Sequence, residues 1–241
     1  MVWKTLRRAG TALLLALLTF AALPVGASLA RQAGTPAPDY SCDTATPEAA
    51  TPAMDHGNMA DRAMGTPMAG MEMTVEFDLL YIDMMLPHHA SIVALSEAAL
   101  PRLEDDRLRE IAQAIITAQE AEIEELRGYR EAFYGSPEPG PMDDHMMGMM
   151  MQAMPGMPGT MAEMAVQMDP LAQVAALCAA PDPDRAFIET TIAHHEMAIA
   201  ASAPALEQAI HPEIADFAQR VIAAQQAEIA ALTVIRQELY G

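Results

Sequence analysis

The sequence predicts an all-α protein, a four-helix bundle made of two duplicated helical hairpins with disordered Met-rich segments beside them. A shift of 106 residues places Asp78–Gly135 on Asp184–Gly241 without a gap, and about a third of the aligned positions are identical. Both copies show the apolar spacing of helices and lack strand-like alternation. Two hairpins supply four apolar stripes, and a four-helix bundle buries all four.

Each copy divides into two helices joined by a short turn. In the first copy we expect helices over residues 78–100 and 107–134, because Asp105 is a favourable N-cap and the second segment contains no proline. In the second copy we expect His211 to cap a helix whose first residue is Pro212.

Methionine is concentrated outside the hairpins. Of the 21 methionines, six lie between Met54 and Met73 and eleven lie between Met142 and Met168. Both stretches are of low complexity, so we expect them to be mobile and their methionines to be metal donors rather than core residues. The expected organisation is a signal peptide (1–27), a Pro/Thr/Met-rich linker (28–75), the first hairpin (76–135), a Met/Pro/Gly-rich linker (136–183) and the second hairpin (184–241).

The charge and the missing motifs exclude several functions. Acidic residues outnumber basic ones 33 to 13, for a net charge of −20, which argues against binding to nucleic acids or to anionic membranes. The sequence has no glycine-rich phosphate loop and no nucleophile elbow, so we expect no phosphate ligand and no enzymatic activity.

Polar residues interrupt the apolar stripe of the second helix in each hairpin. In the first copy these residues are Gln119 and Glu122. Residues equally far from the turn of an antiparallel hairpin lie level, which places His88 and His89 beside them. A buried carboxylate is costly unless it is paired or binds a metal. The pattern is compatible with a His–Glu hydrogen bond in a polar core, but its duplication favours a metal site.

The first helix adds thioethers to this level. Met84 and His88 are four residues apart, as are Met85 and His89, so each pair shares one face of the helix. Adjacent histidines point about 100° apart, so one faces its hairpin partner and the other faces the opposite hairpin. The candidate metal ligands are Met84, Met85, His88, His89, Gln119 and Glu122 in the first copy, and His194, His195, Met197, Gln225 and Glu228 in the second.

The ligand types indicate which metal is expected. Thioether and imidazole together suit copper, especially Cu(I), whereas imidazole and carboxylate without thioether suit zinc, iron or Cu(II). In the second copy Thr190 and Thr191 replace the Met pair, so the two copies can differ in metal or affinity. His56 and His145 are further candidate copper ligands because methionines surround them.

The residues of the first helix resemble a known family. The stretch from Phe77 through Met84-Met85-Leu86-Pro87-His88-His89, followed by the helix with Gln119 and Glu122, is similar to the family named domain of unknown function 305. The resemblance implies a ferritin-like four-helix fold, frequent export and, in some members, copper binding through the Met and His residues of this motif. Carried over, it marks Met84, Met85, His88, His89, His194 and His195.

These observations predict an exported copper-binding protein that sequesters, stores or delivers the metal. The expected partners are metal ions and a copper-accepting protein, and a homo-oligomer is left open. The alternatives are a ferritin-like iron-binding protein and a metal-free structural or interaction module. The iron alternative is weakened because no Glu lies three residues before any His, as di-iron sites of this kind require.

The N-terminus predicts export to the periplasm, the cell envelope or the medium. Lys4, Arg7 and Arg8 precede an apolar run over residues 11–23 that is short for a membrane span, as in a secretory signal peptide. Cleavage is favoured over retention as an anchor. Since export places the chain in an oxidising compartment, its two cysteines, Cys42 and Cys178, either form a disulfide or remain as two thiols.

Overall fold

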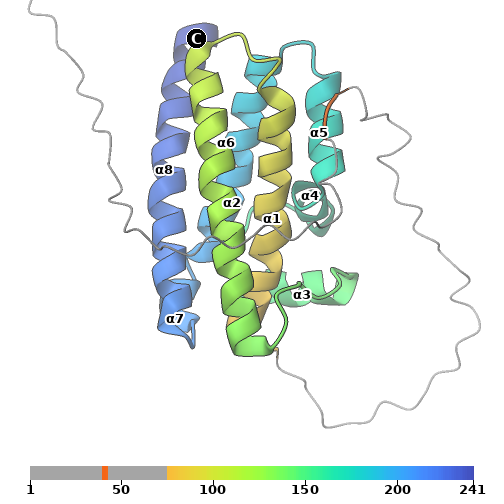
Figure 1. The fold of residues 1–241 in the computed structure, drawn as a ribbon, viewed down its shortest axis with the longest axis vertical. Coiled ribbons are helices and arrows are strands. Elements are labelled where there is room, and N and C mark those ends of the chain that lie inside the picture. Colours follow the sequence, from red (N-terminus) through yellow and green to blue (C-terminus); the bar gives the residue numbers. More distant parts are fainter. Residues whose placement is uncertain (1–39, 43–74) are drawn as a thin grey trace, which may run out of the picture. The chain divides into compact units, whose positions relative to one another are not determined.

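The long helices of the computed structural model pair as two hairpins. The structure describes residues 40–42 and 75–241. The first hairpin consists of α1 (Phe77–Ala99) and α2 (Asp106–Tyr134), and the second of α6 (Pro183–Ser202) and α8 (Pro212–Tyr240). These four helices stand side by side (Figure 1). The described residues contain no strand, which confirms the all-α fold.

Local sequence explains where the long helices begin and end. The Asp105 carboxylate accepts a hydrogen bond from the Arg107 backbone N–H at 2.9 Å, as an N-cap does. Gly135 ends α2 in the left-handed conformation with φ of 79°. Pro212 lies in the first turn of α8, and His211 occupies the N-cap position, but its side chain makes no capping hydrogen bond. His211 is therefore the N-cap residue, as expected, although its side chain does not take part in capping.

Three shorter helices lie between the two hairpins in the sequence: α3 (Asp144–Ala153), α4 (Met161–Gln167) and α5 (Pro170–Ala179). A fourth short helix, α7 (Ala205–Gln208), lies in the turn of the second hairpin. Figure 1 shows α5 alongside α1, with α3 across the end of the bundle where α1 begins. We call the segment from α3 to α5 the inserted helices.

The inserted helices correct the expectation that residues 136–183 are mobile. Each one has an N-cap: Asp143 for α3, Thr160 for α4 and Asp169 for α5. Thr160 also forms a capping box with Glu163. Such short helices are not stable alone, so their order comes from packing: α3 and α5 pack against α1, and α4 packs against α3 and α5.

The methionines of the inserted helices correct a second expectation. Five of them are buried in the core with at most 7% of their surface exposed. They are Met147, Met150, Met154, Met164 and Met168. They pack in one apolar cluster with Met84, Met85 and Met197 of the bundle. Methionine therefore contributes to the core here, as its flexible side chain allows.

The inserted helices also explain the burial of α1. Seventeen of its 23 residues are buried, against seven of 29 in α2, because α1 contacts α2, α6 and α5. A disulfide between Cys42 and Cys178 ties the segment before α1 to α5, which confirms the disulfide alternative. None of the described helices is long and apolar enough to cross a membrane. The proposed signal peptide lies outside the described residues.

Candidate metal centre

The first helices of the two hairpins meet at a pair of histidines. Since α1 and α6 run in opposite directions (Figure 1), the start of α1 lies beside the end of α6, where the Tyr81 and Ser202 hydroxyls are 2.8 Å apart. Further along, the His88 and His194 rings lie face to face, with centroids 3.6 Å apart and planes tilted by 33°. Both side chains are completely buried.

The neighbouring histidines face the other way, toward their own hairpin partners. His89 Nε2 lies 3.2 Å from Glu122 Oε2, and His195 Nε2 lies 2.7 Å from Glu228 Oε2. Neither contact has the direction of a hydrogen bond. The prediction that His89 and Glu122 lie at the same height in the hairpin is therefore confirmed. The prediction that adjacent histidines point in different directions is also confirmed. The two carboxylates are only partly buried, with 21% and 23% of their side chains exposed.

We call the four histidines, with Gln119 and Gln225 beside them, the histidine layer. This layer contains buried polar atoms without hydrogen-bond partners among the described residues. Both ring nitrogens of His88 and the Nδ1 of His194 have no hydrogen-bond partner among the described residues. Gln119 and Gln225, each 2% exposed, also carry unpartnered amide atoms. Buried polar groups are nearly always satisfied, so such a cluster needs a reason such as a bound ion or water.

The stacked histidines are neutral. Burial lowers the pKa of both His88 and His194 well below the usual 6.5, and the neighbouring imidazoles lower it further. A neutral imidazole has a free lone pair on one nitrogen, and this is the form that binds metal.

The predicted thioether ligands are buried on one side of the histidine layer. Met84 and Met85 precede His88 by about one turn, and Met197 follows His194 by about one turn. Because α1 and α6 are antiparallel, these three side chains come from the same direction along the bundle. Thr191 occupies the position of Met85 in the second copy, and its buried hydroxyl has no hydrogen-bond partner in the part of the chain that the structure describes.

The other predicted residues lie elsewhere. His145 is exposed on α3, and His56 lies outside the described residues. The His211 Nδ1 lies 2.8 Å from Asp78 Oδ2, and its ring stacks on Phe133 at 3.8 Å, so its role is structural. Within residues 40–42 and 75–241, no three His, Cys, Asp or Glu side chains converge at metal-binding spacing.

Sequence reasoning missed Ser91, which lies beside the stacked pair. The Ser91 hydroxyl lies 2.9 Å from His194 Nε2 and within hydrogen-bond distance of the backbone carbonyls of His88 and Gln167, which share its single proton. Ser91 thus connects both histidines to the end of α4. Its position three residues after His88, on the same face of the helix, was a signal for this contact.

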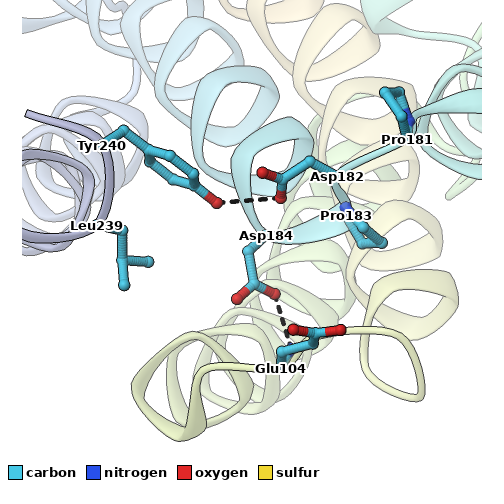
Figure 2. A pocket seen from close by; sticks show the side chains of 7 residues that line it. All are labelled: Glu104, Pro181, Asp182, Pro183, Asp184, Leu239 and Tyr240. Atoms are coloured by element: carbon cyan, nitrogen blue, oxygen red, sulfur yellow. Dashed lines mark hydrogen bonds between the residues drawn. The ribbon is translucent and has the colours of Figure 1, made fainter.

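A pocket of about 350 Å³ lies where α6 begins and α8 ends (Figure 2). Two of its three carboxylates already accept hydrogen bonds: Asp184 from the Glu104 backbone N–H at 2.8 Å, and Asp182 from the Tyr240 hydroxyl at 3.0 Å. The remaining lining residues are Pro181, Pro183 and Leu239. These carboxylates hold helix ends together, so the histidine layer is the better candidate for a metal.

The fold and the histidine layer define the class of protein: a duplicated four-helix bundle with a buried imidazole pair at its centre. The family described as Domain of unknown function (DUF305) matches residues 31–127 and 78–236. The chain therefore belongs to the DUF305 family, as its MMLPHH motif predicted.

Solved structures support the same assignment. CopM in its Cu(I)-bound form is 27% identical and superposes with a TM-score of 0.54, covering 68% of this chain and 98% of CopM. CopM in its Cu(II)-bound form is 29% identical, with a TM-score of 0.52 and coverage of 68% and 97%. A DUF305 protein from Streptomyces coelicolor shares the fold at 22% identity, with a TM-score of 0.53 and coverage of 68% and 93%. No curated protein matches this chain.

Proposed function

We propose that this protein is an exported copper-binding protein that holds Cu(I) at the histidine layer. The observation that carries the proposal is the stacked His88–His194 pair, which is buried and neutral and has unpartnered ring nitrogens. Export is proposed from the signal peptide in the sequence. Copper is the cargo of such a protein, so no chemical reaction is required.

The donors near the layer favour a soft monovalent ion. Imidazole suits copper, and the buried thioethers of Met84, Met85 and Met197 select Cu(I) over harder ions. His89 and His195, each beside a partly exposed carboxylate, offer a harder donor pair that suits Cu(II), zinc or iron. We therefore propose the stacked pair for Cu(I) and treat the two His–Glu pairs as supporting contacts.

The structural relatives support the choice of metal. CopM, similar over 68% of this chain, has been solved with Cu(I), with Cu(II) and with silver. Silver(I) shares the soft character of Cu(I). A protein that holds Cu(I) away from water and oxygen can sequester it, store it or deliver it to a copper-accepting partner.

An anaerobic Cu(I) titration against a competing chelator tests the proposal. We expect the double variant H88A/H194A to bind Cu(I) at least about tenfold more weakly than the wild type, a change of about 1.4 kcal/mol. The matched control is H145Q, which changes an exposed histidine of α3 outside the layer and should leave the affinity unchanged. Equal affinity of H88A/H194A and the wild type would overturn the proposal.

A further inference from the structure

A completely buried metal centre needs a way in. The His88 and His194 side chains have no exposed surface, so an ion from solvent must pass other side chains first. The inserted helices cover the side of α1 that a bare bundle would leave open (Figure 1). The side chains of these helices are therefore candidates for the first contacts of an incoming ion.

Methionine is distributed unevenly in the core. The apolar cluster on the side where α1 begins contains all the buried methionines of the described residues, whereas the cluster beyond the histidines contains only aliphatic and aromatic side chains and alanine. A residue used only to fill gaps would be expected in both clusters. The thioethers instead extend from the histidine layer in one direction only.

The methionines of this cluster differ in exposure. Met146, Met149 and Met157 are partly buried at the rim of the cluster. Met164 and Met168 lie deeper, at 2% and 7% exposure, and are four residues apart on one face of α4. Met150 and Met154, at the end of α3, are completely buried, as are the methionines of α1 and α6.

The end of α4 reaches the histidines through Ser91. Gln167, the residue before Met168, accepts a hydrogen bond through its backbone carbonyl from the Ser91 hydroxyl. The same hydroxyl lies 2.9 Å from His194 Nε2. The end of α4 is therefore in contact with the stacked pair through a single side chain.

We propose that the methionines of α3 and α4 form an entry path by which Cu(I) reaches His88 and His194. The path rests on the proposed function, because it supplies the metal for that centre. Neutral thioethers are soft ligands that bind a monovalent ion without the cost of burying a second charge. Successive methionines accept the ion as it leaves water, and the imidazoles receive it at the end.

The experiment measures the rate at which a chromophoric Cu(I)–chelator complex transfers its ion to the protein, followed anaerobically by stopped flow. The test variant is M164L/M168L, which keeps hydrophobicity and approximate volume but removes two thioethers. The control is M161L, the same change on the same helix at a side chain that is 38% exposed and outside the cluster. Circular dichroism and thermal melting check that each variant folds.

We expect M164L/M168L to load about tenfold more slowly than the wild type, with an equilibrium affinity within about twofold of it. M161L should load at the wild-type rate. Wild-type loading by folded M164L/M168L would overturn the path. A loss of affinity with an unchanged rate would also overturn it, because these methionines would then be ligands of the centre itself.

If M164L/M168L does not fold, M147L/M150L/M154L makes the same test on α3, and wild-type loading by that variant would again overturn the path. The titration of H88A/H194A keeps the two proposals apart. An unchanged Cu(I) affinity in H88A/H194A would contradict the proposed function, whereas an unchanged loading rate in M164L/M168L would contradict only the entry path.

Discussion

Removing the Asp78 carboxylate should loosen the connection between the two hairpins. Asp78 is fully buried at the start of α1 and accepts the backbone N–H groups of Ile210 and His211 at 3.0 and 2.8 Å. Asp184, its equivalent in the second repeat, accepts the N–H groups of Glu104 and Asp105 at 2.8 and 3.0 Å. Each repeat thus holds the turn of the other, which helps to set His88 opposite His194.

The cost follows from the donors that lose a partner. In D78A these are the two backbone N–H groups and the His211 ring, whose Nδ1 lies 2.8 Å from the carboxylate. A hydrogen bond to a charged group contributes about 1.5–3 kcal/mol, and the three share one acceptor, so we expect a loss of about 3–5 kcal/mol. For a folded region of this size, that loss lowers the melting temperature by about 10 °C.

The free energy of unfolding is measured by urea denaturation followed by circular dichroism. D184A should lose less than D78A, about 2–3 kcal/mol, because only two backbone donors are affected. The control is D216A, an exposed carboxylate on α8, which should change stability by less than about 0.5 kcal/mol. A loss below about 1 kcal/mol in D78A, or a loss as large in the control, would refute this reasoning.

Three further outcomes are expected. D83A should lower the free energy of unfolding in urea by about 3–5 kcal/mol, because the buried Arg130 guanidinium, 2.5 Å from the Asp83 carboxylate, loses its partner. The loss should be smaller in D83A/R130M, and equal losses in the two variants would contradict the pairing. C42S should lower stability by about 2–5 kcal/mol, and the unreduced wild type should react with no thiol reagent, since Cys42 and Cys178 are paired. Y81F should lose about 1 kcal/mol with the hydrogen bond to Ser202, and a neutral result would show that this contact is dispensable.

Much of the bundle follows from the sequence because the duplication provides an internal check. A position that is polar in both copies of an apolar stripe, such as that of Gln119 and Gln225, marks a shared feature of the two hairpins. The level of His89 beside Glu122 required only the geometry of an antiparallel hairpin. The face-to-face contact of His88 with His194 needed more, namely the packing of one hairpin on the other, and no local pattern reports that distance.

The inserted helices show where sequence reasoning failed. The segments of α3 to α5 are short and are separated by Pro and Gly, so their periodicity is too brief to recognise. Their order depends on α1, which is far away in the sequence. The signal was in α1 itself: it is apolar around most of its circumference, which indicates a helix covered on more sides than a four-helix bundle alone covers.

The most direct test of the central claim is the position of the ion in a crystal of the Cu(I)-loaded protein, located by anomalous diffraction at the copper edge. Our account predicts the strongest peak at the stacked pair, within about 2 Å of ring nitrogens of both His88 and His194, the usual length of a metal–imidazole bond. Peaks confined to surface carboxylates or to His145, with the stacked pair unchanged, would contradict it.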